Sequence, residues 1–331
     1  MKQRIVWIVG VCALFRLGSW GFLMHRTIDQ LAVYELPKSM QPFFYKNLDY
    51  IVKYSVRPDE RRSTDSTEAP KHFIDFEAYG DSAAWKMPLT WNEAVAKYSK
   101  DTLFEYGYVP YVIMDMKEKL TRAFREKNKD SILFYAADMG HYIEDAHVPL
   151  HTTLNYDGQL TGQKGMHSLW ESMVPEIDIN TYNLSSRHKA RYLKQPEQAV
   201  WEALRKTHLL VPDVFRFEIE TSKDFTDSTK YRTQVRRGRE VKNYSSDFAR
   251  AYSRRLGSTV NEQAIHAANL FSDFLYTCWV DGGKPDLTPL LTSNMTEQDK
   301  KALKQQIKWF KKNELLENKA LISRQGKTDS E

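Results

Sequence analysis

The amino-acid sequence predicts an all-α fold, a multi-helix bundle with a metal site in its core. Apolar residues recur at helical spacing over most of the chain, and strand-like alternation is almost absent. A hydrophobic content of 41% supports a packed core rather than a disordered chain. The third observation is a segment, residues 141–171, in which histidines and acids are concentrated among apolar residues.

The first half of the chain contains the clearest helical patterns. Residues 20–37 and 43–56 carry apolar residues at helical spacing, and Pro37 ends the first of these helices. Residues 90–127 predict one or two amphipathic helices, whose methionines and aromatic residues belong in a core rather than around a cofactor. A helix over 131–148 then leads into the histidine-rich segment.

Two pairs of residues in this segment have i,i+4 spacing, His141 with Asp145 and His167 with Glu171. On a helix this spacing places both side chains on one face, one turn apart. Imidazole nitrogens and carboxylate oxygens that converge in this way form the ligand shell of a zinc-type site. A single pair is more often part of a solvated helix face. Two pairs on either side of a further histidine, His151, favour a buried metal site.

The second half of the chain is harder to interpret. Residues 185–262 are rich in Arg and Lys, most densely around 231–240. Because acids are interleaved with these basic residues, a solvated helical face is favoured over a nucleic-acid surface. Residues 262–280 predict another helix with a buried face, in which His266 has a structural role. A charged amphipathic helix and a polar tail, residues 296–331, end the chain.

The first nineteen residues have the form of a secretory signal peptide. Lys2 and Arg4 precede an apolar run, and the small residues Gly18 and Ser19 precede Trp20. The apolar run is too short to span a bilayer as a permanent helix. We therefore expect an exported protein, periplasmic or secreted after cleavage. A signal anchor or a buried first helix is the alternative.

Cleavage after residue 19 would change both the charge and the cysteine content. The formal net charge would fall from +5 to +2, because three basic residues and no acids are removed. Net charge alone then argues little for a nucleic-acid partner. Cys12 would be removed as well, leaving Cys278 and no intrachain disulfide. Bound metal would then supply the cross-linking that disulfides supply in other exported proteins.

Together these residues resemble the superfamily that joins bacterial zinc-dependent phospholipases C to the fungal and plant single-strand-specific nucleases. The resemblance covers roughly residues 20–171. It rests on nine positions that match in order, namely Trp20, His25, Asp59, His72, His141, Asp145, His151, His167 and Glu171. It implies an all-helical zinc-dependent phosphodiesterase domain over residues 20–295 with three zinc ions. The charged helix and tail of residues 296–331 would follow this domain.

The resemblance also implies how the nine residues are shared among three zinc ions. One zinc would be held by Asp59, His72, His141 and Asp145. A second would be shared by Asp145, His25 and the free amine and carbonyl of Trp20. The third would be held by His151, His167 and Glu171.

The implied chemistry is hydrolysis of a phosphodiester by a zinc-bound hydroxide. The catalytic residues would be Asp145, which bridges two ions, and Asp59. The pKa of a water between those ions would fall from about 15.7 toward about 7, so that no protein nucleophile is needed. The third zinc would offset charge on the leaving oxygen.

The resemblance leaves two substrate classes open, namely phospholipid and single-stranded nucleic acid or nucleotide. Glu171, where the nucleases usually carry Asp, and the short gap from His151 to His167 look like phospholipase C and slightly favour it. The start WGxxxH, His147 within HVPLH, and Trp170 look more like the nucleases. A single-strand-specific nuclease or 3'-nucleotidase is therefore the alternative.

Two further residues are candidates for substrate binding. Phe73 and Asp75 follow His72 and match positions that the nucleases use to hold a base, although the phospholipases carry a similar HFxD string. The sequence indicates no protein partner and no oligomeric state.

A hypothesis from another class is a non-catalytic, zinc-stabilised binding protein of the cell envelope. Such a protein would need closed shells of four ligands around each ion. Nine ligand residues for three ions leave coordination positions open, which is typical of a catalytic site.

Overall fold

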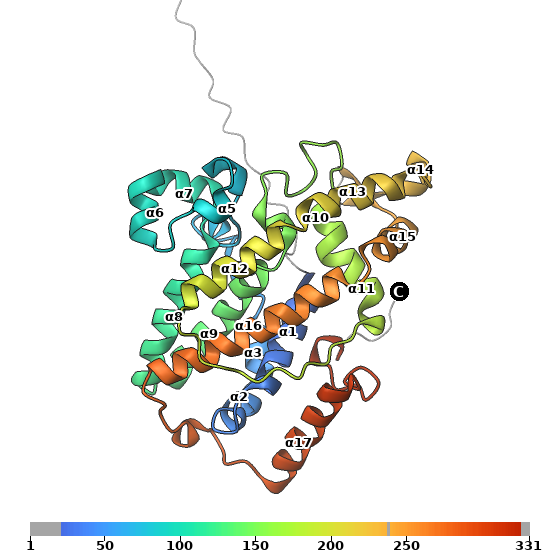
Figure 1. Ribbon diagram of the computed structural model, residues 1–331. Coiled ribbons are helices and arrows are strands. Elements are labelled where there is room, and N and C mark those ends of the chain that lie inside the picture. Colours follow the sequence, from blue (N-terminus) through green and yellow to red (C-terminus); the bar gives the residue numbers. More distant parts are fainter. Residues whose placement is uncertain (1–20, 237–238, 326–331) are drawn as a thin grey trace, which may run out of the picture.

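The computed structural model describes residues 21–236 and 239–325, and it confirms the all-α prediction (Figure 1). The first α-helices are α1 (Gly21–Glu35), α2 (Gln41–Lys46), α3 (Leu48–Tyr54), α4 (Arg57–Arg61), α5 (Ala83–Lys86), α6 (Trp91–Tyr98), α7 (Lys100–Tyr106) and α8 (Val109–Arg125). Those that follow are α9 (Lys129–Asp145), α10 (Met166–Ser168), α11 (Val174–Asp178), α12 (Pro196–His208), α13 (Val211–Ser222), α14 (Asp227–Lys230), α15 (Ser246–Leu256), α16 (Thr259–Asp281) and α17 (Glu297–Lys312).

Short helical turns connect several of these helices. Most have 3-10 geometry, whereas η4 is a π-helical turn. They are η1 (Ala69–Lys71), η2 (Phe76–Tyr79), η3 (Pro149–Thr152), η4 (Leu169–Met173), η5 (Ile179–Thr181), η6 (Thr288–Leu290) and η7 (Ile322–Arg324).

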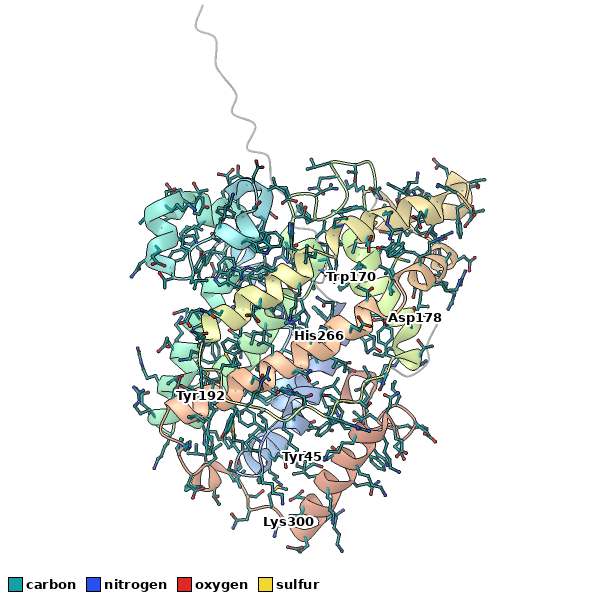
Figure 2. All side chains as sticks on the ribbon, viewed as in Figure 1. Tyr45, Trp170, Asp178, Tyr192, His266 and Lys300 are labelled. Atoms are coloured by element: carbon teal, nitrogen blue, oxygen red, sulfur yellow. The ribbon has the colours of Figure 1, made fainter. Side chains whose placement is uncertain are left out.

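Helix α1 lies at the centre of the bundle and contacts α3, α9 and α16. Ala32 and Val33 belong to one hydrophobic cluster of the core, whereas Leu23 and Ile28 belong to a second cluster. Side chains fill the space between these helices (Figure 2). Because apolar side chains leave α1 in several directions, both clusters remove its surface from water, which stabilises a central helix.

Gly140 brings α1 and α9 close together. A Cβ atom at this position would lie 2.4 Å from Oδ1 of Asp29 on α1 and 2.9 Å from the ring of Phe271 on α16. Only a residue without a side chain fits this gap. The close approach sets His25 of α1 beside His141, the neighbour of Gly140 on α9, with ring centroids 4.2 Å apart.

Local sequence signals explain where two of the predicted helices begin. The side chain of Asn128 accepts a hydrogen bond from the backbone N–H of Ser131 and so caps α9. At α17, Thr296 and Asp299 form a reciprocal capping box. The pattern over 90–127, predicted as one or two helices, forms three, α6, α7 and α8.

The prediction of a solvated helical face around residues 231–240 is wrong. This stretch forms an antiparallel hairpin of β1 (Tyr231–Arg236) and β2 (Arg239–Tyr244). Tyr231 pairs with Tyr244, and their rings lie 5.2 Å apart at the base of the hairpin. Cross-strand aromatic pairs of this kind stabilise a hairpin, and interleaved charges do not distinguish a hairpin from a helix.

His266, for which the sequence predicts a structural role, is exposed on α16 (Figure 2). Among the described residues, Cys278 is a free cysteine and is buried. The predicted signal peptide and Trp20 lie outside the described residues. Among the helices that the structure describes, none combines the length and apolarity needed to cross a bilayer.

Candidate metal centre

The histidines and acids predicted to bind metal come from separate parts of the chain and converge in the core. They are carried by α1, by α4, by the end of η1, by α9, by η3 and by the turn from α10 into η4. Three groups of their ligand atoms lie close enough to hold an ion, with His25, His141 and Asp145 in one group, Asp59, His72 and His141 in another, and His151, His167 and Glu171 in the last.

The group around Asp59 has four potential ligand atoms, because Asp145 also faces it. Oδ2 of Asp145 lies 2.8 Å from Nδ1 of His72 and 3.2 Å from Nε2 of His141. Oδ1 of Asp59 lies 3.8 Å from Nδ1 of His72 and 3.9 Å from Nε2 of His141. Two imidazole nitrogens and two carboxylate oxygens therefore surround one point, as a tetrahedral zinc site requires.

The carboxylate of Asp145 presents its two oxygens to different groups. Whereas Oδ2 faces His72 and His141, Oδ1 lies 3.9 Å from Nε2 of His25 and 3.4 Å from Nδ1 of His151. The side chain is fully buried, so both oxygens are withdrawn from bulk water. A carboxylate in this position can bridge two cations.

The group that contains His151 is formed by η3 and by the turn into η4. Oε1 of Glu171 lies 3.0 Å from Nε2 of His151, and Oε2 lies 3.0 Å from Nε2 of His167. Neither oxygen forms an aligned hydrogen bond, although both are buried. The predicted second helix is here a π-helical turn, which still brings His167 and Glu171 together.

Carboxylates and a carbonyl behind the histidines hold the rings in place. The backbone carbonyl of Ser55 accepts a hydrogen bond from Nδ1 of His141 at 2.7 Å, which leaves a lone pair on Nε2. Nδ1 of His25 lies in hydrogen-bond contact with Glu144, so its Nε2 is the atom that faces Asp145. Such partners orient metal-binding histidines in many proteins.

Glu68 has the corresponding position behind His72, with Oε1 3.6 Å from Nε2 of the ring. It is buried and also contacts Arg61, Lys71 and Tyr142. Sequence reasoning missed Glu68 and Glu144. The i,i+4 spacing of Glu68 and His72 was a signal that could have found the first of them.

The ionised form of two acids of this centre, Asp145 and Glu171, is favoured. Burial raises the pKa of Asp145, but the histidines His141 and His151 outweigh it and hold that pKa well below its usual range. Burial opposes ionisation of Glu171 as well, yet His167 and His151 lower its pKa to about 2. Buried carboxylates that stay charged are the donors a divalent cation needs.

Neighbouring acids also determine the charge state of His72. Burial lowers its pKa, but hydrogen bonds to Asp145 and Glu68 outweigh burial and raise it to about 9. Nε2 of His141 lies 3.1 Å from Nδ1 of His72. Two ring nitrogens that face each other at this distance fit a cation between them, and the residues present therefore fit a zinc-type metal centre.

The candidate substrate residues lie beside this centre. Asp75 is almost fully buried, and burial, then Glu77, raise its pKa to about 7, with His151 acting in the opposite direction. Phe73 is partly buried, and its carbonyl accepts hydrogen bonds from the backbone of Val109. Gly107 approaches this carbonyl so closely that a Cβ atom would lie 2.3 Å from it, at a positive φ that also favours glycine.

The chain is similar to one protein family and to a solved structure. The sequence model of the S1/P1 nuclease family matches residues 20–275 of the chain. Among solved structures, the alpha toxin from Clostridium absonum is 14% identical with a TM-score of 0.47. That match covers 82% of this chain and 66% of the toxin chain, just under two thirds of its length. No curated protein matches the sequence.

Proposed function

Since the chain belongs to the S1/P1 nuclease family, we propose that it hydrolyses phosphodiesters at a zinc centre built on Asp145. The observation that carries the proposal is the buried Asp145 carboxylate, which turns one oxygen toward His72 and His141 and the other toward His25 and His151. Members of the superfamily are zinc-dependent phosphoester hydrolases. We also propose that the protein is exported and that Trp20 becomes its first residue.

Three sets of residues would hold zinc. Asp59, His72, His141 and Asp145 surround the first position, and His151, His167 and Glu171 surround another. His25 and Asp145, together with Trp20 if it is the amino terminus, would hold the remaining ion. Zinc bound there supplies Lewis-acid activation of water and stabilises negative charge on the phosphoryl group.

The residues of the chain supply orientation and charge around these positions. Ser55, Glu144 and Glu68 hold the rings of His141, His25 and His72 so that each presents one nitrogen to the interior. Fixed ligand geometry costs no reorganisation during the reaction, which is the basis of electrostatic preorganisation.

For the substrate, we propose single-stranded nucleic acid, because the matched family is one of nucleases. Phe73, with Asp75 next to the His151 group, is suited to hold a base by stacking and hydrogen bonding. Phospholipid is the second candidate. It is favoured by Glu171, the residue that resembles the phospholipases at the closing ligand position.

The substrate proposal is tested by assaying one purified protein on two substrates. A protein beginning at Trp20 should contain zinc and hydrolyse single-stranded DNA, and a chelator should abolish the activity until zinc is restored. Turnover of phosphatidylcholine instead would establish the second candidate. If neither substrate is hydrolysed although zinc is bound, the zinc-stabilised binding protein becomes the better hypothesis.

The role of Trp20 needs its own comparison. A second protein with one extra residue before Trp20 has no free α-amine at that position. We expect it to bind one zinc fewer and to lose most activity. Equal zinc content and activity in both proteins would contradict the amine ligand.

A further inference from the structure

Residues 153–165 form a loop that connects η3 to α10, the helix that carries His167. The loop is folded against itself. The backbone N–H of Gln163 donates to the carbonyl of Gly158 at 2.9 Å, and a Cβ atom at Gly158 would lie 2.3 Å from the carbonyl of Gln163. Asp157 accepts a hydrogen bond from the backbone N–H of His167 at 3.3 Å. The conformation of this loop therefore determines where the backbone of His167 lies.

His167 depends on its backbone more than the other histidines of the metal centre. The rings of His25, His72 and His141 each have a side chain or a carbonyl behind them. Among the described residues, by contrast, Nδ1 of His167 has no hydrogen-bond partner, although this atom is buried. Its other nitrogen, Nε2, lies 3.0 Å from Oε2 of Glu171. The position of the loop is therefore what directs this ring toward Glu171.

Gln163 anchors the loop to the second half of the chain. Its side-chain amide donates to Oε2 of Glu218 at 2.6 Å and to the carbonyl of Phe215 at 3.0 Å, and both partners lie on α13. The backbone carbonyl of Gln163 accepts a hydrogen bond from the hydroxyl of Tyr244 on β2 at 3.2 Å. Gln163 is buried, so these contacts are withdrawn from water. Buried hydrogen bonds of this kind hold one geometry, because breaking them leaves polar groups unpaired.

Glu218 lies at the centre of these contacts and is itself buried. Its Oε1 atom lies 2.6 Å from the ammonium of Lys230 and accepts a hydrogen bond from the hydroxyl of Tyr244 at 3.0 Å. The hydroxyl of Ser222 donates to the same oxygen at 3.2 Å. A buried carboxylate needs such partners to offset its desolvation. Because the donors come from the loop, α13, α14 and β2, they fix the carboxylate in space and hold Gln163 against it.

We propose that Glu218 is a positioning residue for the metal group of His151, His167 and Glu171. Through Gln163, it holds the loop in the conformation that turns Nε2 of His167 toward Glu171. The inference rests on the proposed function, in which this group binds zinc. The residues of the other two groups are carried by other elements, so the effect of Glu218 is confined to one zinc position.

The proposal is tested by zinc titration of the wild type, Glu218→Gln and Gln163→Met against a competing chelator. Glu218→Gln removes the charge at the centre of the network. Gln163→Met keeps the length of the side chain but removes its donors. We expect one zinc site to weaken about tenfold in each variant, with the remaining zinc unchanged. The double variant should lose no more affinity than the weaker-binding single variant, because both substitutions break one contact.

Tyr252→Phe separates positioning from a general loss of stability. The buried Tyr252 hydroxyl donates to the carbonyl of Val214 on α13 at 2.9 Å. Its removal loosens the same helix but leaves the contacts of Gln163 in place, so zinc affinity should equal that of the wild type. The proposal is overturned if Glu218→Gln and Gln163→Met bind zinc as the wild type does. It is also overturned if Tyr252→Phe weakens the same site equally.

A second measurement does not depend on zinc. In the metal-free protein, hydrogen exchange at the His167 amide should be about fivefold faster in Gln163→Met than in the wild type, because an anchoring hydrogen bond is lost. Unchanged exchange would contradict the role of Gln163 and Glu218. Failure of the wild type to bind zinc would instead contradict the proposed function, and the exchange rates would still support or overturn the anchoring of His167.

Discussion

The two parts of the chain on either side of Glu171 treat their ionisable side chains differently. In residues 21–171, acids and histidines such as Asp145 and His25 are completely buried and face one another. In residues 172–325, several ion pairs, such as Arg216 with Asp213, lie at the surface and are half exposed, although Glu218 and Asp273 are buried. Desolvated charges must be balanced by close partners or a cation, whereas solvated pairs are weakly coupled to the fold. Substitutions in the first part should therefore have far larger effects.

The largest effect is expected for Asp145→Asn. The amide keeps the shape of the side chain but removes the charge that faces both groups of ligands. We expect hydrolysis to fall on the order of 10³-fold or more, with zinc lost from two positions together. Metal analysis and steady-state kinetics measure both. Asp213→Asn, in the second part of the chain, is the control and should change neither. Full zinc content in Asp145→Asn would disprove the bridge.

The next effect concerns Glu35, which lies where α1 meets α16 and accepts a hydrogen bond from Ser272. Burial raises the pKa of Glu35 from 4.5 to about 7, against the opposing effect of this hydrogen bond. Between pH 4.5 and about pH 7, Glu35 is therefore protonated in the folded protein and ionised in the unfolded chain. The contribution of Glu35 to the free energy of unfolding is therefore fully present below pH 4.5. It falls by about 3 kcal/mol as the pH rises to 7.

Denaturant unfolding of wild type and Glu35→Gln at pH 5 and pH 8 measures this loss. Gln carries no titrating proton, so the stability difference between the two proteins should shift in favour of the variant at pH 8. Parallel pH dependence in the two proteins would show that Glu35 does not titrate in this range. Comparing the proteins at each pH cancels the common contribution of the metal ligands.

Glu68→Gln should have a smaller effect on the metal centre. The substitution removes the negative charge that faces Nε2 of His72 and leaves every candidate metal ligand unchanged. Zinc affinity or activity should fall about 10–100-fold. Zinc titration against a competing chelator measures this change. Glu60→Gln, an exposed acid on α4, is the matched control. Identical zinc affinities in the two variants would remove Glu68 from the site.

The smallest effect is expected in the second part of the chain, for Arg216→Gln. Arg216 pairs with Asp213 and Glu220 on one exposed helix face of α13. Its removal should change the stability of the protein very little, and by less still at high salt, because solvent screens the pairs. Thermal unfolding in low and high salt measures it. A loss comparable to that of the buried groups would break the contrast between the two parts.

Sequence reasoning predicted most helices from the spacing of apolar residues and two candidate ligand pairs from i,i+4 spacing, whereas His25, Asp59 and His72 became candidates through the family resemblance. The spacing of His141 and Asp145 predicts a shared helix face, and α9 provides it. The prediction from charge density is wrong at residues 231–240, which form two paired strands. Tyr231 on one strand pairs with Tyr244 on the other, and a local charge pattern contains no information about such a partner.

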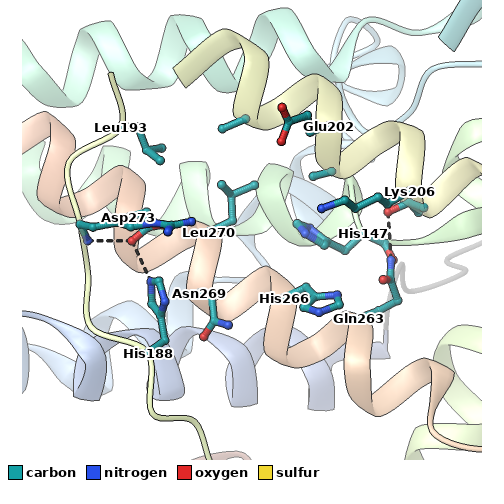
Figure 3. Close-up of a pocket in the computed structure, with 14 residues that line it drawn as sticks. His147, His188, Leu193, Glu202, Lys206, Gln263, His266, Asn269, Leu270 and Asp273 are labelled. Carbon is teal, nitrogen blue, oxygen red and sulfur yellow. Dashed lines mark hydrogen bonds and ion pairs between the residues drawn. The ribbon is translucent and has the colours of Figure 1, made fainter. Parts of the chain in front are cut away.

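The sequence by itself determined the helical class of the fold and indicated the pairs His141 with Asp145 and His167 with Glu171, since side-chain chemistry and helical spacing are local properties. The other candidate ligands followed from the family resemblance. Only the tertiary structure decided that the two oxygens of Asp145 face different histidines, that Glu68 stands behind His72, and that His147 and Lys206 line one cavity (Figure 3). These contacts join residues far apart in the chain. They depend on how closely the helices pack, for which the missing side chain of Gly140 is one physical cause.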